Sequence, residues 1–278
     1  MINNQMSRGL IQTLTIALLM CSCNSPKDQS NKIGTEMDIP LIGFDYIGSY
    51  PHSTNSFTEG LLVHDGRLYE STGSPKELPR TRSEIGTVDL RTGHVKTKVE
   101  IDHNKYFGEG IVILNERVYQ LTYKSKTGFI YDVNSFKKIA EFAIPSKEGW
   151  GMTTDGTNLI MSDGTNILTY LNPEDCSVIK EINVTENGFA KGYLNELEFI
   201  HGYIYANVWM TNTIVKINPT NGRVIGVLDL SSYATNAKSV FNGSLEMNGI
   251  AYDSIRDRVY ITGKLWPKIY EIKINHNK

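Results

Sequence analysis

The sequence lacks a surplus of charge of either sign, since 28 Lys and Arg stand against 30 Asp and Glu in 278 residues. Nucleic-acid-binding proteins usually carry a basic surplus, because neutralisation of phosphates supplies much of their affinity. We therefore expect no nucleic-acid partner. Proline is scarce at 9 residues and long Ala-, Leu-, Glu- and Lys-rich stretches are missing, whereas Gly (24) and Tyr (15) are frequent. This composition predicts an all-β protein with many turns.

The chain also lacks an apolar run long enough to span a bilayer. Its longest N-terminal run, Leu10–Met20, falls well short of the roughly 20 residues that a spanning helix needs. Arg8 before this run and small residues after it give the layout of a secretory signal. The stretch Met20-Cys-Ser-Cys23 resembles a bacterial lipobox, with a small residue before the cysteine that becomes lipidated. We expect cleavage before Cys23 and lipidation of Cys23; an ordinary secreted protein that is cut nearby is the alternative.

Cysteine is too rare for a disulfide framework. Of the three cysteines, Cys21 and Cys23 belong to the N-terminal segment, so Cys176 has no partner inside the mature chain. A lone buried thiol is the predicted role of Cys176. The six histidines show no paired metal-ligand spacing, and we expect most of them at the surface or in turns. No metal and no other cofactor are expected.

Five copies of one pattern organise the rest of the chain. Each copy is an apolar strand, a short turn and a second strand that ends in small or aromatic residues. The copies begin at Gly60, Gly110, Gly151, Leu197 and Gly249, and a second hairpin follows each of the first four. Four antiparallel strands per unit at this period are typical of a propeller blade.

The fifth unit is short, and the other end of the chain offers its missing strand. Residues 268–274 supply a third strand before the chain ends, and residues 40–50 precede the first unit at the spacing of an outer strand. Ring closure by this N-terminal strand would remove two exposed sheet edges. The sequence thus predicts a five-bladed β-propeller over about residues 37–275. A pair of β-sandwiches is the alternative, but it would not explain five repeats in register.

The predicted domain boundaries follow from these features. Residues 1–22 form a lipoprotein signal peptide, 23–36 a polar tether, and 37–278 a five-bladed propeller that forms the catalytic domain. The mature protein is expected in the cell envelope, as a monomer with a lipid anchor in a bacterial membrane, either periplasmic or on the outer surface.

Residues that break the strand pattern recur at matching places in the repeats. Just before each innermost strand stands one such residue, and others follow the second strand of a unit. The first set is Glu59, Glu109, Trp150, Asn195 and Asn248, and the second includes Tyr123, Trp209 and Lys264. In a propeller these positions gather at one end of the central channel. The sequence therefore predicts a pocket with aromatic walls and a few polar groups.

Two carboxylates near aromatic rings indicate acid–base chemistry. Glu59 and Glu109 cannot both ionise without cost, so one should have a raised pKa and carry a proton near neutrality. Lys264 could offset the remaining charge or stabilise an oxyanion. Alternatively, both carboxylates only accept backbone N–H bonds, the tryptophans belong to the core, and Asn195 and Asn248 only make turns.

Eight short motifs together resemble those of the plant- and bacterial-type glutaminyl-peptide cyclotransferases, in the family's order. They are Phe57-Thr-Glu-Gly60, Phe107-Gly-Glu-Gly110, Gly149-Trp-Gly-Met152, Ser162-Asp-Gly-Thr165, Leu194-Asn-Glu-Leu-Glu198, Ala206-Asn-Val-Trp209, Leu245-Glu-Met-Asn-Gly-Ile250 and Thr262-Gly-Lys-Leu-Trp-Pro267. The resemblance covers about residues 44–274. It implies a five-bladed propeller that converts N-terminal glutamine of peptides and proteins to pyroglutamate, releases ammonia and uses no zinc.

The resemblance also implies roles for single residues. The acid–base carboxylate falls on Glu109, and the substrate-pocket positions fall on Asn195, Trp150, Trp209 and Lys264, with Phe57 and Phe107 at the same mouth. We expect the two tryptophans to clamp the glutamine chain, Asn195 to orient it, and Lys264 to stabilise the oxyanion.

Two positions depart from the family pattern. Glu59 stands where a glutamine is common, and Tyr123 where a tryptophan is common. The first adds a negative charge that could raise the pKa of Glu109, and the second makes an aromatic wall smaller. Two other functions stay open: a non-catalytic, surface-tethered propeller that binds a peptide or glycan at the channel mouth, and a different lyase or hydrolase that uses the two glutamates.

Overall fold

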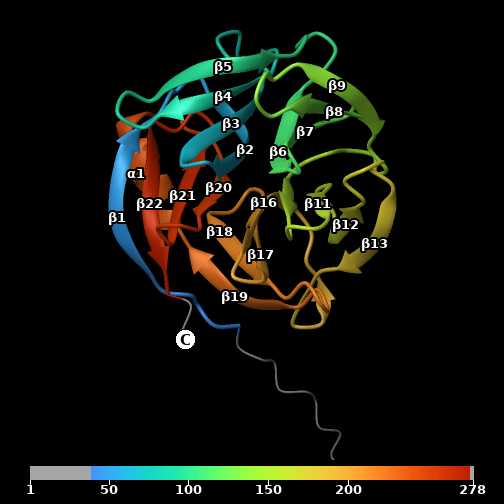
Figure 1. Cartoon of the computed structure of the whole chain (residues 1–278). Coiled ribbons are helices and arrows are strands. Elements are labelled where there is room, and N and C mark those ends of the chain that lie inside the picture. Colours follow the sequence, from blue (N-terminus) through green and yellow to red (C-terminus); the bar gives the residue numbers. More distant parts are fainter. Residues whose placement is uncertain (1–38, 276–278) are drawn as a thin grey trace, which may run out of the picture. The chain divides into compact units, whose positions relative to one another are not determined.

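The computed structural model describes residues 39–275, which form five four-stranded antiparallel sheets arranged as a ring (Figure 1). The five-bladed β-propeller predicted from the repeats is confirmed. The predicted signal peptide, with the lipidation site Cys23, and the predicted tether lie outside the described residues.

Each of the first four blades is a meander of consecutive strands. Blade 1 contains β2 (Phe57–His64), β3 (Arg67–Gly73), β4 (Glu84–Asp89) and β5 (His94–Glu100). Blade 2 contains β6 (Gly108–Leu114), β7 (Arg117–Thr122), β8 (Thr127–Asp132) and β9 (Lys138–Ala143). Blade 3 contains β10 (Met152–Thr154), β11 (Leu159–Ser162), β12 (Ile167–Leu171) and β13 (Val178–Asn183). Blade 4 contains β16 (Leu194–Ile200), β17 (Tyr203–Val208), β18 (Thr213–Ile217) and β19 (Val224–Asp229).

Blade 5 is built from both ends of the propeller sequence. Its strands β20 (Met247–Asp253), β21 (Arg258–Gly263) and β22 (Lys268–Ile274) are completed by β1 (Phe44–Pro51). The outer strand β1 pairs antiparallel with β22, from Phe44 opposite Ile274 to Pro51 opposite Lys268. The predicted closing strand is therefore confirmed, and it removes the sheet edges that an open ring would expose.

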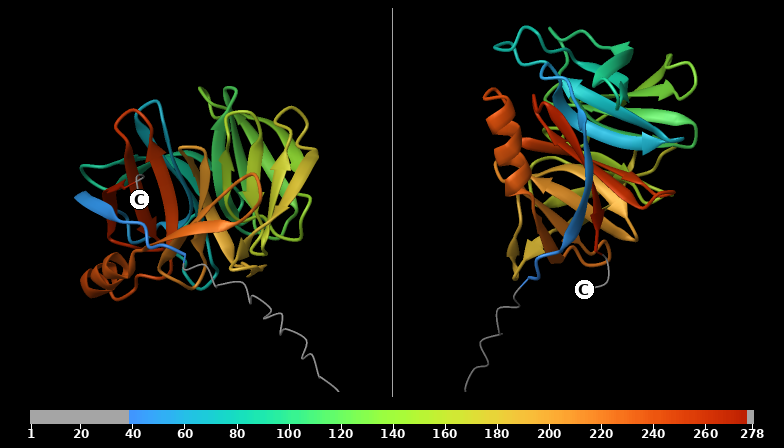
Figure 2. Two further views of the ribbon diagram at one scale, coloured as in Figure 1. Left: turned by 90° about the horizontal axis from the view of Figure 1, so that it is seen from below. Right: turned by 90° about the vertical axis from the view of Figure 1, so that its left-hand side faces the viewer.

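Two elements were not predicted from the sequence. A small hairpin of β14 (Thr185–Glu186) and β15 (Phe189–Ala190) follows blade 3, and helix α1 (Ser231–Val240) follows blade 4. The helix lies beside blade 5 (Figure 2), where the ring of Tyr233 packs 4.5 Å from that of Tyr270. Only Ala237 of the helix is buried, while Tyr233 and Ala234 are partly buried and pack against the core between blades 4 and 5. Tertiary contacts stabilise this short helix. Within residues 39–275 no helix is long and apolar enough to cross a membrane.

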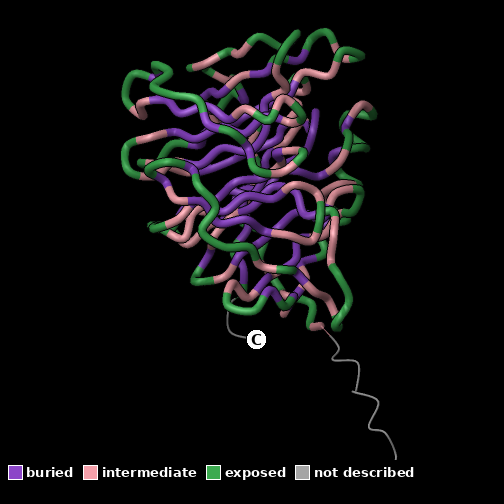
Figure 3. Tube along the Cα trace, turned by 90° about the vertical axis from the view of Figure 1, so that its right-hand side faces the viewer, coloured by how far each residue is buried: buried purple, intermediate pink, exposed green. Residues whose placement is uncertain are grey.

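The core lies between neighbouring blades, because successive side chains of a strand point to opposite faces. In β12, Leu168 packs against blade 4, whereas Leu171 packs against blade 2. Buried segments accordingly run through the middle of the propeller, and exposed ones follow its outer strands and connections (Figure 3). Cys176 is buried in the blade 2–blade 3 core as a free thiol, as predicted, and this burial raises its pKa to about 11.

The inner strands approach each other closely around the channel. A Cβ atom on Gly60 would lie 2.9 Å from the backbone N of Ile111, and one on Gly110 would lie 2.6 Å from the backbone N of Met152. One on Gly151 would lie 2.2 Å from the backbone O of Asn195. Glycine at these places lets neighbouring blades meet backbone to backbone.

In blade 4 a carboxylate takes the place of the glycine that other blades have next to the site residue. Glu196 accepts hydrogen bonds from the backbone N of Ile250 (2.7 Å) in blade 5 and of Leu61 (3.4 Å) in blade 1. Its side chain therefore reaches across the channel and satisfies buried donors of two blades. Burial raises the pKa of Glu196 well above 4.5.

Gly110→Ala is expected to lower the free energy of unfolding by about 1–3 kcal/mol, because the added methyl group meets the backbone of blade 3. The control is Gly48→Ala in β1, where a Cβ atom has nothing within 4 Å. Urea titrations of the two variants check this. Equal stabilities of the two variants would show that the inner strands have room for a side chain.

Candidate functional site

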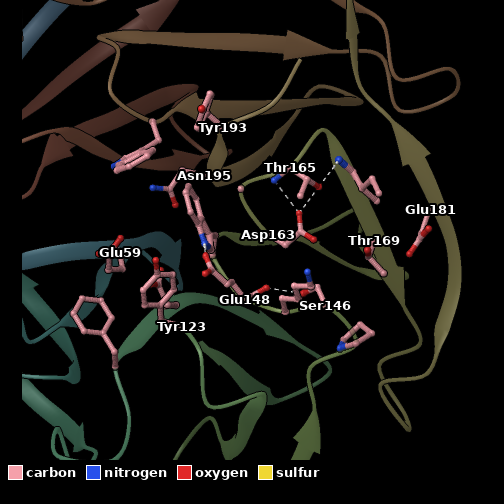
Figure 4. A pocket seen from close by; sticks show the side chains of 18 of the residues that line it. Glu59, Tyr123, Ser146, Glu148, Asp163, Thr165, Thr169, Glu181, Tyr193 and Asn195 are labelled. Carbon is pink, nitrogen blue, oxygen red and sulfur yellow. Dashed lines mark hydrogen bonds between the residues drawn. The ribbon is translucent and has the colours of Figure 1, made fainter. Parts of the chain in front are cut away.

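One cavity of about 890 Å³ opens at an end of the channel, and all nine predicted site residues line it. Figure 4 labels Glu59, Tyr123 and Asn195 among the lining residues. The nine predicted residues are Phe57, Glu59, Phe107, Glu109, Tyr123, Trp150, Asn195, Trp209 and Lys264. They come from all five blades, and seven of them, all but Phe57 and Phe107, stand at positions that the repeat alignment singled out. Their chemical roles stay predictions.

Backbone irregularities aim the first set of side chains. The ladders between the first two strands shift register between Thr58 and Gly60 in blade 1 and between Gly108 and Ile111 in blade 2. Each shift is a β-bulge that contains a site glutamate, and a bulge re-aims a side chain from the face that simple alternation would give it. The bulges of blades 1 and 2 thus present Glu59 and Glu109 to the cavity.

The side chains of the second set are positioned by the ends of the second strands of their blades. Tyr123, Trp209 and Lys264 are each the first residue after β7, β17 and β21. Each backbone N–H bonds to a carbonyl just before the inner strand of the same blade, as when Trp209 N donates to Tyr193 O over 2.8 Å. Both sets therefore lie at the same edge of every blade.

Glu59 and Lys264 form a buried ion pair. The Nζ atom of Lys264 lies 2.8 Å from Oε1 of Glu59, and Nδ2 of Asn248 donates to Oε2 of Glu59 over 2.9 Å. The same ammonium lies 4.6 Å from the centroid of the Phe57 ring, a cation–π distance. Burial raises the pKa of Glu59 to about 7, even though Lys264 and Asn248 favour its charged form. Asn248 does not line the cavity but holds Glu59.

The carboxyl group of Glu109 has neither an ion-pair partner nor a hydrogen-bond donor comparable to those of Glu59. Glu109 is 5% exposed, and no hydrogen bond or ion pair joins its carboxyl group to another residue of the described chain. Burial raises its pKa well above 4.5, and the negative charge of Glu59 raises it further, while Lys264 opposes both. Glu109 therefore keeps its proton to a higher pH than an exposed carboxyl group does. Within residues 39–275 no backbone N–H donates to either glutamate side chain, in contrast to the purely structural interpretation.

Lys264 remains charged in this environment. Burial alone would lower its pKa, but the carboxyl groups of Glu59 and Glu109 raise it by more, so the net shift is upward. The site thus contains the Glu59–Lys264 pair and, separate from it, the carboxyl group of Glu109, and burial raises the pKa of both carboxyl groups.

Aromatic rings form two walls around these charges. On one side Phe107 lies 5.9 Å from Phe57, edge to face, and 6.0 Å from Tyr123. On the other side Trp150 and Trp209 meet edge to face, with centroids 5.7 Å apart. Both tryptophans are half-buried at the cavity, whereas the third one, Trp266, is fully buried in the core of blade 5. The core interpretation therefore fits Trp266 only.

Asn195 offers an unpaired amide group. Its Oδ1 atom is buried without a hydrogen-bond partner, while its backbone O accepts a bond from Ser162 Oγ over 2.7 Å. A buried acceptor without a partner is costly. A ligand that donates a hydrogen bond to Asn195 would remove this cost.

Sequence reasoning missed several residues at the cavity, among them Glu148, Tyr193 and Asp163. Trp150 Nε1 donates to Oε2 of Glu148 over 3.0 Å, and Tyr193 packs its ring 5.9 Å from that of Trp209. Glu148 and Tyr193 belong to connections between blades, and the variable length of these connections gives no repeat signal. Asp163 could have been found, because it follows the second strand of blade 3 at the position of Tyr123, Trp209 and Lys264 in their blades.

Potential metal ligands do not cluster in the described part of the chain, where no group of three or more His, Cys, Asp or Glu is placed to hold a metal ion. One histidine differs from the expectation of surface and turn positions. His52 is buried, and its Nε2 atom lies 2.9 Å from Oε1 of Glu70. Its Nδ1 atom lies 2.8 Å from the backbone O of Trp266, so the His52–Glu70 pair links blades 1 and 5.

Known proteins share both the sequence pattern and the fold. The family model of glutamine cyclotransferase matches residues 14–274. A glutaminyl-peptide cyclotransferase of Arabidopsis thaliana is 39% identical over 248 residues, which cover 88% of this chain and 76% of that protein. The crystal structure of Myxococcus xanthus glutaminyl cyclase superposes with a TM-score of 0.76 at 31% identity, over 85% of this chain and 98% of that chain. A chain of a nidogen/laminin complex, with a TM-score of 0.50 and 15% identity over 75% of this chain and 73% of that chain, shares the fold alone.

Glu59→Gln is expected to make stability less dependent on pH. In the folded protein the pKa of Glu59 is raised from 4.5 to about 7, so the folded state keeps a proton that the unfolded chain loses. The resulting stabilisation is fully present below pH 4.5 and is lost as the pH rises to about 7. Urea titrations should show a fall in the free energy of unfolding over this range that is about 1–3 kcal/mol smaller in the variant.

The matched control for this prediction is Glu77→Gln, the same change at an exposed residue. This control should keep the pH dependence of the wild type. A Glu59→Gln variant with an unchanged pH dependence would mean that Glu59 is fully ionised in the folded protein throughout this range.

Proposed function

Because this chain belongs to the glutamine cyclotransferase family, we propose that it converts the N-terminal glutamine of peptides and proteins to pyroglutamate with release of ammonia. The observation that carries the proposal is the state of Glu109. Its carboxyl group is buried and unpaired within the described residues, burial raises its pKa well above 4.5, and the Glu59–Lys264 pair lies beside it in the same cavity. Such a group can both accept and donate a proton.

The reaction needs one proton to move and no external oxidant or reductant. The α-amino nitrogen of the substrate attacks the carbon of its own γ-carboxamide, and a new C–N bond closes a five-membered lactam ring. The C–N bond to the amide nitrogen then breaks, and this nitrogen leaves as ammonia. The attacking nitrogen loses one proton and the leaving nitrogen gains one, so a single carboxyl group can serve both steps.

The raised pKa of Glu109 favours this exchange. An N-terminal amine has a pKa of about 7.7–8.0, and burial with the neighbouring Glu59 raises the pKa of Glu109 from 4.5 towards that range. A proton can then move between the two groups at little cost. General acid–base catalysis of this kind typically contributes about 10²–10⁴ in rate.

The other residues bind the substrate and stabilise charge. Trp150 and Trp209 clamp the aliphatic part of the glutamine side chain, and the free amide of Asn195 orients its polar end. Ring closure is intramolecular, so a folded side chain held close to attack removes much of the barrier. The Lys264 ammonium stabilises the oxyanion of the tetrahedral intermediate, while Glu59 keeps that ammonium charged and in place.

The opposite aromatic wall closes the site. Phe57, Phe107 and Tyr123 exclude water from the reacting atoms and keep the dielectric constant low around Glu109. The proposed chemistry is complete with these side chains, and we propose that it proceeds without a metal.

We further propose that the mature protein is a monomer anchored in a bacterial cell envelope through a lipid on Cys23. The support is the lipobox-like stretch Met20-Cys-Ser-Cys23 after the apolar segment, followed by the polar residues 24–32.

Mass spectrometry of a Gln-initiated peptide tests the reaction. The wild-type protein should convert the peptide to a product that has lost one ammonia, with or without a chelator. Glu109→Gln should lower kcat by at least about 10², because an amide cannot exchange the proton. Glu77→Gln, an exposed site, should keep the wild-type rate.

Three other outcomes would contradict parts of this proposal. A Glu109→Gln variant that is folded and fully active would refute the proton-carrier role. Formation of a Glu-initiated peptide would mean hydrolysis. Binding of Gln peptides by a folded wild-type protein without any turnover above the spontaneous rate would support the non-catalytic propeller.

Cys23→Ser tests the anchor. The wild-type chain expressed in a bacterium should be found in the membrane fraction and incorporate labelled palmitate, because lipidation of Cys23 supplies the anchor. The variant should lose the label. Incorporation of label by Cys23→Ser, or no label in the wild type, would contradict lipidation at this residue.

A further inference from the structure

The cavity extends much farther to one side of the channel than to the others. Blades 1, 4 and 5 line it only with residues near the channel mouth. Between blades 2 and 3 the lining continues outward as far as β13, the outermost strand of blade 3. We call this part the blade 2–3 groove, defined by Pro145, Ser146, Lys147, Asp163, Thr169 and Glu181.

Strand register explains the position of the groove. In β12, Leu171 faces blade 2 and is part of the shared core. Thr169 lies two residues closer to the mouth on the same face, and it is paired with Glu181 of β13. The apolar core between the two blades therefore ends at Thr169, and the cavity begins there. Figure 4 shows Asp163, Thr169 and Glu181 in succession, leading away from Asn195.

The blade 3 wall of this groove carries one hydroxyl group without a hydrogen bond and two carboxylates outside any ion pair of the described residues. Thr169 is 5% exposed, lines the cavity, and its hydroxyl makes no hydrogen bond within the described chain. Glu181 is exposed and belongs to no ion pair of residues 39–275. Asp163 uses Oδ1 to accept the backbone N–H of Thr165 over 3.0 Å, and it too belongs to no ion pair there.

Neighbouring cations do not neutralise this wall. Lys180 lies next to Glu181 in the chain, but its ammonium lies 4.2 Å from the centroid of the Tyr170 ring, on the face towards blade 4. Lys124 is 3.3 Å from Glu148. Lys147 is exposed on the opposite wall, in the connection from blade 2. The blade 3 wall is thus acidic and faces the solvent.

We propose that the blade 2–3 groove binds the residues that follow the N-terminal glutamine, and that Asp163 and Glu181 favour peptides with lysine or arginine among them. This inference rests on the proposed function. The reaction occupies only the first residue, so the rest of a peptide substrate must leave the cavity. The groove is the continuous path outward, and the unpaired Thr169 hydroxyl lies along it.

The test compares kcat/KM for peptides that begin with glutamine and differ only by Lys or Glu at the second, third or fourth position. The wild-type protein should prefer a basic residue at one or more positions. Glu181→Gln and Asp163→Asn should each reduce the Lys-to-Glu ratio by about two- to fivefold, as expected for exposed ion pairs. Added salt should reduce the ratio in the wild type.

Glu141→Gln is the matched control. Glu141 lies opposite Phe129 in the β8–β9 ladder, as Glu181 lies opposite Thr169 in the β12–β13 ladder, but it does not line the cavity. This variant should keep the ratio of the wild type.

A short substrate separates this inference from the proposed function. If glutamine amide is turned over but the Lys and Glu peptides react at equal rates, or if the ratio persists in the Asp163→Asn/Glu181→Gln double variant, the groove does not select basic residues. An equal fall in rate for glutamine amide in these variants would also overturn the inference, since that substrate does not reach the groove. No turnover of any substrate by the folded wild type would overturn the proposed function itself.

Discussion

The close approach of backbones around the channel is the constraint on which the site depends. Because Gly60, Gly110 and Gly151 have no side chains, neighbouring inner strands meet backbone to backbone. The bulges next to two of these glycines turn Glu59 and Glu109 out of the strand pattern and towards the channel mouth. Ring closure by β1 then completes the circle that keeps residues far apart in sequence at one place.

Because the site residues converge in a closed ring, several carboxyl groups are buried, and the cost of their burial is offset in different ways. Glu59 is compensated by Lys264 and Asn248. Glu196 accepts hydrogen bonds from backbone N–H groups of blades 1 and 5 and so connects the inner strands of three blades. Glu109 has no compensating partner among residues 39–275, so its pKa is raised well above 4.5, first by burial and then by the Glu59 charge. Glu109, the carboxyl group without an ion pair or hydrogen bond in the described residues, is therefore the group that we propose exchanges a proton with the substrate.

The fold and the site positions could be predicted because the chain repeats. Period-2 alternation and the spacing of five units determine the blades, and the ring geometry determines which ends meet, so Glu59, Glu109 and Lys264 could be located together. Helix α1 could not, since Ala237 is its only buried residue and its stability comes from blade 5. The His52–Glu70 pair was missed because burial of a histidine depends on tertiary contacts. The outward extension of the cavity between blades 2 and 3 was missed because it depends on where side-chain packing ends, which no repeat reveals.

The protonation state of Glu109 is the central claim, and infrared difference spectroscopy tests it most directly. Spectra of the folded wild-type protein minus Glu109→Gln, recorded at neutral pH, should show the C=O stretching band of one protonated carboxyl group. The band should disappear as the pH is raised through the pKa of Glu109. A difference spectrum that instead shows only carboxylate bands at neutral pH would mean that Glu109 is ionised in the resting protein, and it would contradict this account.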